Sequence, residues 1–98
     1  MHNFIISASV QILPIVQDKH PYKWIDEAID VIKLSGIKYT VGPFATELEG
    51  TYEEVMKVID DINNYLFSKN CREWICIAQI QIRSNTDITA NEKTSKFK

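Results

Sequence analysis

The sequence has few of the residues that build metal or redox sites, and it has no excess of basic side chains. Its 98 residues include two histidines and two cysteines, and 11 Lys and Arg against 13 Asp and Glu give a formal net charge of -2. Cys71 and Cys76 lack the spacing of a CxxC pair or a zinc knuckle, and His2 and His20 have no second ligand at helical spacing. We therefore expect no metal site, and no broad basic surface for nucleic acid.

Long apolar runs are also missing. No run approaches the ~20 residues that a membrane-spanning helix needs, so we expect no membrane partner. The N-terminal segment MHNFIISASV lacks the basic flank and the cleavage site of a signal peptide, which favours a cytoplasmic location. A hydrophobic fraction of 45% in a chain of this length is enough for one domain with one core.

The apolar pattern alternates with period two in some segments and follows helical spacing in others. Pro21 is favourable at a helix start and Gly36 at a helix end, while Thr51 followed by Glu54 predicts a capping box. In the first helix, Ile25, Ala28, Ile29 and Ile32 have the spacing of a buried stripe. The predicted strands cover residues 4–13, 37–41, 44–49 and 74–83, and the predicted helices cover about 21–35 and 52–68.

This order of elements, β-α-β-β-α-β, predicts an α+β ferredoxin-like sandwich: a four-stranded antiparallel sheet with two helices on one face. The interpretation places the two long strands, first and last, side by side in the middle of the sheet. Residues 1–84 form the ligand-binding domain in this interpretation. The polar residues 85–98 form a C-terminal tail that is either loose or docked on a partner subunit.

The sheet face away from the helices is the most informative predicted surface. Only Lys38 and Arg83 are expected to bring charge to it, while hydroxyl, amide and aliphatic groups fill the rest. We predict that another copy of the chain covers this open face and leaves a pocket of neutral hydrogen-bonding groups between the subunits. The alternative is a solvated face that happens to use serine and glutamine.

Three stretches carry a resemblance to a known family: SVQILP at 9–14, SGIKYTVGPFATELEG at 35–50 and EKTSKFK at 92–98. The chain resembles the small stand-alone thiamine-binding proteins with a ferredoxin-like fold. The resemblance implies a homo-oligomer, dimer or tetramer, that binds thiamine (vitamin B1) or its hydroxymethylpyrimidine moiety. The family's pattern matches Gly42, Pro43, Thr46, Glu49 and Gly50, and matches Ser7, Ser9 and Gln11 less closely.

The candidate ligand-binding residues combine neutral polar groups with carboxylates and one aromatic ring. Hydroxyl and amide groups suit the donors and acceptors of an aminopyrimidine, whereas a carboxylate near an aromatic face suits a cationic thiazolium. These residue types also have purely structural explanations. Glu49, for example, can interact favourably with the dipole at the start of the second helix, and Thr46 has a high propensity for strands. The candidates are Ser7, Ser9, Gln11, Phe44, Thr46, Glu47, Glu49 and Gln79.

Other functions remain to be weighed against ligand binding. An enzyme of the acylphosphatase type needs a basic, anion-binding loop after the first strand, but residues 14–18 contain no Arg, Lys or Gly, and no nucleophile stands beside a base. We therefore expect no catalysis and no resident cofactor. RNA recognition would need aromatic residues on the open face, where hydroxyl, amide and aliphatic groups are expected instead, so we do not expect it. A regulatory module for another small metabolite, such as an amino acid, differs from thiamine binding only in the ligand.

Overall fold

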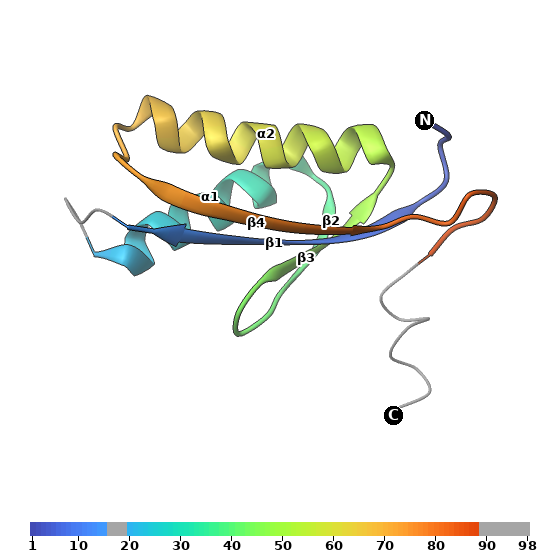
Figure 1. Ribbon diagram of the computed structural model, residues 1–98, viewed down its shortest axis with the longest axis horizontal. Coiled ribbons are helices and arrows are strands. Elements are labelled where there is room, and N and C mark those ends of the chain that lie inside the picture. Colours follow the sequence, from blue (N-terminus) through green and yellow to red (C-terminus); the bar gives the residue numbers. More distant parts are fainter. Residues whose placement is uncertain (16–19, 89–98) are drawn as a thin grey trace.

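The computed structural model describes residues 1–15 and 20–88 of the chain. Its elements follow the predicted order, which confirms the ferredoxin-like α+β fold. Both helices lie on one side of a four-stranded antiparallel sheet (Figure 1). The elements are β1 (Ile6–Pro14), α1 (Pro21–Ser35), β2 (Lys38–Val41), β3 (Thr46–Gly50), α2 (Tyr52–Ser68) and β4 (Trp74–Gln81).

The helix ends follow the local signals in the sequence. Helix α1 begins at Pro21 and ends at Gly36, whose φ of 80° is left-handed and suits glycine. Helix α2 has the predicted capping box. The Thr51 amide donates to Glu54 Oε1 at 2.9 Å, and the Glu54 amide donates to Thr51 Oγ1 at 3.3 Å. These two bonds satisfy backbone donors that the first turn leaves unpaired.

The strand order is β2-β3-β1-β4, and this corrects one detail of the sequence interpretation. The first and last strands do pair side by side, but β4 lies at an edge of the sheet and not in its middle. Each helical crossover joins two parallel strands that have one strand between them. Strand β3 therefore lies between β1 and β2, and β1 lies between β3 and β4.

The core lies between the sheet and the helices. Strand β1 contributes Ile6, Ala8, Val10 and Ile12, all of them at most 7% exposed. The predicted stripe on α1 is only partly correct. Ala28 and Ile32 are buried as expected, together with Trp24, whereas Ile25 and Ile29 are half-buried. The largest fully buried side chains are Ile6, Ile32, Leu48, Ile62, Leu66, Ile88 and Val55.

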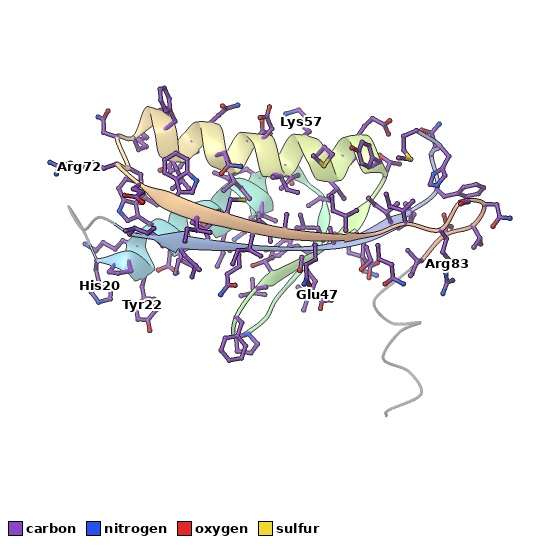
Figure 2. The ribbon with its side chains drawn as sticks, in the orientation of Figure 1. His20, Tyr22, Glu47, Lys57, Arg72 and Arg83 are labelled. Atoms are coloured by element: carbon purple, nitrogen blue, oxygen red, sulfur yellow. The ribbon has the colours of Figure 1, made fainter. Side chains whose placement is uncertain are left out.

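The open face carries more charge than the sequence interpretation assigned to it. Glu47 lies opposite Ser9 and Glu49 lies opposite Ser7 in the β1–β3 register, so both carboxylates share the face with the serines. Figure 2 shows Glu47 on the side of the sheet away from the helices. The interpretation was wrong here because Leu48 must point into the core, which turns both neighbouring glutamates outward.

The chain beyond β4 turns back toward the first strand. The Ile88 amide donates to the Ile5 carbonyl oxygen at 3.0 Å, and the Ile88 side chain is fully buried. The Ile5 amide donates to Asp87 Oδ1 at 2.7 Å. The first residues of the predicted tail, 85–88, are thus part of the packed domain, while 89–98 lie outside the described residues.

Candidate ligand-binding site

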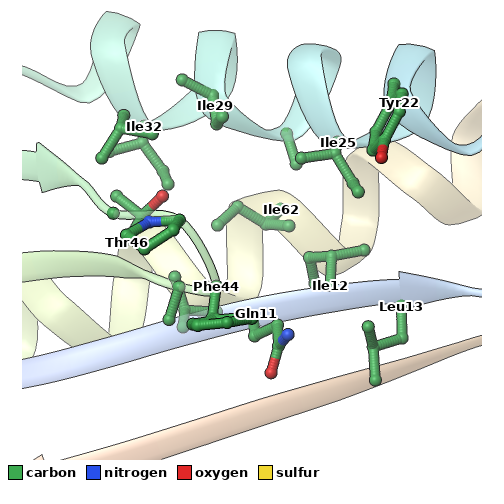
Figure 3. A pocket seen from close by; sticks show the side chains of 16 residues that line it. Gln11, Ile12, Leu13, Tyr22, Ile25, Ile29, Ile32, Phe44, Thr46 and Ile62 are labelled. Atoms are coloured by element: carbon green, nitrogen blue, oxygen red, sulfur yellow. The ribbon is translucent and has the colours of Figure 1, made fainter.

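A cavity of about 200 Å³ lies between α1, the end of β1 and the turn that joins β2 to β3. In Figure 3, Ile25 and Ile29 extend from α1 toward β1, and Phe44 comes from the β2–β3 turn. The lining residues are mostly aliphatic, with two aromatic rings at the rim. They are Val10, Gln11, Ile12, Leu13, Tyr22, Ile25, Ala28, Ile29, Ile32, Val41, Gly42, Pro43, Phe44, Ala45, Thr46 and Ile62.

The cavity exists because β3 is shorter than β1. Pairing between these strands stops at Val10 and Thr46, whereas pairing of β1 with β4 continues to Pro14 and Trp74. Past Val10, the chain that would extend β3 curls into the β2–β3 turn. Helix α1 spans the gap, and its Ile25 and Ile29 remain half-buried because no strand fills the space beneath them.

The cavity combines apolar walls with a few neutral polar groups. Thr46 is buried at 6% exposed and presents a hydroxyl, and Tyr22 presents a phenol. Gln11 is among the lining residues, but its side chain alternates with core-facing Val10 and Ile12 and points away from α1 in Figure 3. No charged side chain is among the described lining residues. A cavity of this kind suits a flat, neutral ring with hydrogen-bonding atoms on its edge.

The β2–β3 turn sets the rim of the cavity. The Gly42 amide donates to the Ala45 carbonyl oxygen at 2.9 Å and closes the turn. A Cβ atom on residue 42 would lie 2.8 Å from this oxygen, so only glycine fits without a backbone shift. The turn holds Phe44 at the cavity mouth with 81% of the residue exposed.

A second hollow, of about 190 Å³, lies on the open face. Most of its lining residues are polar, with Ser7 and Ser9 from β1, Glu47 from β3, and Gln79 and Gln81 from β4; Ala8 and Ile80 complete the lining. Beside this hollow, Glu49 Oε2 lies 3.3 Å from Lys38 Nζ, and the Glu49 side chain is only 10% exposed.

The structure divides the predicted site residues between the two hollows. Ser7, Ser9, Glu47 and Gln79 line the open-face hollow, and Glu49 lies next to it. Gln11, Phe44 and Thr46 line the cavity beside α1.

The sequence analysis did not include Tyr22, Ile25 or Ile29 as lining residues. The spacing of the two isoleucines reads as core, and no pattern in the sequence marks them as walls of a cavity.

The described part of the chain also limits other kinds of site. Within residues 1–15 and 20–88, no group of three or more His, Cys, Asp or Glu side chains is arranged to hold a metal ion. Nor does any helix in these ranges have the length and apolar character needed to cross a membrane.

Fold and cavity together define a small ferredoxin-like domain with an uncharged pocket beside its first helix. Over residues 8–98 the sequence matches the model of a family described as thiamine-binding protein. The match covers nearly the whole chain, and the chain belongs to this family. A UPF0045 protein from Clostridium perfringens is 28% identical over 92 residues, which is 94% of this chain and 96% of that protein.

Solved structures of similar proteins agree with the fold. A domain of unknown function from Bacillus cereus superposes with a TM-score of 0.91 at 28% identity, covering 98% of this chain and 92% of that one. A proposed thiamine biosynthesis/salvage protein from Thermotoga maritima gives a TM-score of 0.85 at 32% identity, with 96% and 99% covered.

Proposed function

We propose that this protein binds thiamine or its hydroxymethylpyrimidine moiety, without catalysis, in the cavity between α1 and the β2–β3 turn. The observation that carries the proposal is the uncharged lining of this cavity in a chain that belongs to the thiamine-binding protein family. The relative from Thermotoga maritima, described in terms of thiamine biosynthesis or salvage, supports the same ligand class. This location differs from the open-face pocket expected from the sequence.

The chemistry of the cavity favours the pyrimidine half of thiamine inside it. An aminopyrimidine is flat and neutral, and its donors and acceptors suit the Thr46 hydroxyl and the Tyr22 phenol. A thiazolium ring is a permanent cation, which an apolar cavity without a carboxylate would hold at a high desolvation cost. The thiazolium therefore stays at the mouth, where the exposed ring of Phe44 offers a cation–π contact.

The volume points to the same division of the ligand. A cavity of about 200 Å³ is smaller than the ~300–1,000 Å³ typical of sites that enclose a drug-sized molecule. It has room for one substituted ring, with the rest of the ligand outside. Phosphates attached to the thiazole end would then remain in solvent. We expect thiamine and its phosphates to bind with similar affinity.

The proposal includes assembly with further copies of the chain, as a dimer or a tetramer. Leu13, Ile75 and Ile77 cluster at one end of the open face, where Leu13 lies opposite Ile75, and they are 36%, 46% and 43% exposed. Leu13 also lines the ligand cavity. A second copy packed on this apolar end would bury it and adjoin the ligand site.

The proposal is tested by calorimetric titration with hydroxymethylpyrimidine, thiamine and thiamine diphosphate. All three should bind at one site per chain. Thr46→Val should weaken binding about tenfold through loss of one buried hydrogen bond. The matched control is Thr40→Val, because Thr40 is exposed on the open face of β2 and should leave affinity unchanged. Absence of binding by all three compounds would overturn the proposal.

A second candidate ligand is a small amino compound in the open-face hollow. The Glu47 carboxylate and the neighbouring Ser9 and Gln79 groups could hold an ammonium group by charge and hydrogen bonds. Glu47→Gln separates the two possibilities. It should abolish binding of an amino acid in this hollow, and it should leave pyrimidine binding in the α1 cavity unchanged.

A further inference from the structure

We infer that the main-chain N–H and C=O groups of Ile12 form the donor–acceptor pair that binds the edge of the ligand's heteroaromatic ring. The inference deepens the proposed function and rests on it, because it assigns the atoms that recognise a pyrimidine in the α1 cavity. It concerns backbone atoms, and so no side-chain pattern in the sequence identifies them.

The register of β1 and β4 shows which way these groups point. One residue past the last strand pair, Pro14 with Trp74, the Ile15 amide donates to the Glu73 carbonyl oxygen at 2.9 Å. Opposed residues in an antiparallel ladder alternate between hydrogen-bonded and non-hydrogen-bonded pairs. Ile12 and Cys76 therefore form a non-hydrogen-bonded pair, and the Ile12 N–H and C=O point away from β4.

On that side of β1, the neighbouring strand has already ended. The β1–β3 register runs from Ile6 to Val10 and stops there in the described residues. Val10 has the same orientation as Ile12, so its backbone groups face Thr46 of β3. Two residues further on, the Ile12 groups face the space where β3 would continue, which is the cavity.

The position of Pro14 fits the same alternation of hydrogen-bonded and non-hydrogen-bonded pairs. Proline has no N–H to donate, and position 14 is a non-hydrogen-bonded pair with Trp74, so the ladder with β4 continues to Ile15 without losing a bond. The Ile12 side chain is 7% exposed and belongs to the core. Its contribution to a ligand is thus made by the main chain.

Backbone groups beside an apolar cavity are costly to leave without a partner. An N–H and a C=O of one residue on the same strand edge match a ring that carries an amino group next to a ring nitrogen. The ring nitrogen accepts from the Ile12 N–H, and the amino group donates to the Ile12 carbonyl oxygen. A ligand bound in this way replaces the missing residue of β3, as peptides do when they extend a sheet edge. The class of ligand is therefore a planar heterocycle with an amidine-like edge.

The experiment uses the full chain labelled with ¹⁵N and titrated with hydroxymethylpyrimidine, with calorimetry in parallel. On binding, the Ile12 amide proton should shift downfield and its hydrogen exchange should slow at least tenfold. The Leu13 amide is the matched internal control. It belongs to a hydrogen-bonded pair with Ile75, and its exchange should change little.

A second measurement removes each partner of the proposed bonds in turn. Replacing Ile12 by its α-hydroxy acid gives an ester variant, which lacks the backbone N–H but keeps the side chain. This variant should bind hydroxymethylpyrimidine about tenfold more weakly. A ligand analogue with methyl in place of the amino group should lose affinity by a similar factor.

The outcomes separate this inference from the function on which it rests. If hydroxymethylpyrimidine binds but the Ile12 amide is unaffected and the ester variant binds normally, the inference fails and the proposed function stands. If no pyrimidine binds, both fail. Slowed exchange at Ile12 with weaker binding by the ester variant supports both.

Discussion

Tyr65 of α2 donates a hydrogen bond of 2.8 Å from its hydroxyl to Glu27 Oε1 of α1. This bond joins the two helices, and the Tyr65 side chain packs against the core. The Glu27 carboxylate raises the pKa of Tyr65 above its usual value near 10, because ionisation of the phenol would break the bond and place two negative charges together; partial burial adds to the shift.

Tyr65→Phe should lower the free energy of unfolding by about 1.5 kcal/mol, the low end expected for loss of one hydrogen bond to a charged acceptor, because the bond is only partly buried. The bond's contribution is fully present below pH 10 and is lost as the pH rises through the raised pKa of the folded state. Urea denaturation at pH 7 and above pH 10 measures both effects. A wild-type–to–variant difference that stays constant across this range would contradict the assignment.

The stability that the capping box of α2 contributes has the opposite pH dependence. The Thr51 amide donates to the Glu54 carboxylate and lowers the pKa of Glu54 from its usual value near 4.5. The stabilisation is present above pH 4.5 and is lost as the pH falls through the lowered pKa. Thr51→Ala should cost about 1 kcal/mol at pH 7. Glu54→Gln keeps an acceptor and should reduce the loss of stability between pH 7 and pH 3, measured by thermal unfolding.

Gly42 should matter for binding as well as for stability. Gly42→Ala places a methyl group 2.8 Å from the Ala45 carbonyl oxygen, so the turn must shift and move Phe44 away from the cavity mouth. We expect thiamine affinity to fall about tenfold or more. The control is Gly36→Ala, which strains a left-handed helix end that is not part of the cavity lining and should lower the melting temperature while leaving affinity unchanged. Equal thiamine affinities in the two variants would show that the β2–β3 turn does not contribute to the binding site.

Local chemistry made most of the fold predictable from the sequence. Gly36, Thr51 and Glu54 each determine a helix end through a bond or a backbone conformation that involves only nearby residues. Alternation assigned β1 correctly because every second residue is aliphatic. The same rule would have placed Glu47 and Glu49 on the open face had it been anchored on Leu48.

The candidate site was less predictable, because it depends on a difference in length between two strands. Alternation from Phe44 onward predicts a longer β3, but the bond from Gly42 to Ala45 uses those residues for the turn. The cavity, the half-buried state of Ile25 and the orientation of the Ile12 backbone all follow from that one local choice. Strand register depends on both paired strands, so it cannot be predicted from the sequence of either strand alone.

The apolar end of the open face gives a direct test of assembly. Ile77 is 43% exposed beside Leu13 and Ile75, and Ile77→Lys would bury a charge in any subunit interface formed there. We expect the wild-type chain to be a dimer or tetramer by light scattering at micromolar concentration, and the variant to shift toward monomer. Met56→Lys is the control, since Met56 is 36% exposed on α2, in the layer on the opposite side of the sheet. It should leave the mass unchanged. A wild-type monomer, or a Met56 variant that dissociates like the Ile77 variant, would show that the open face is not the interface.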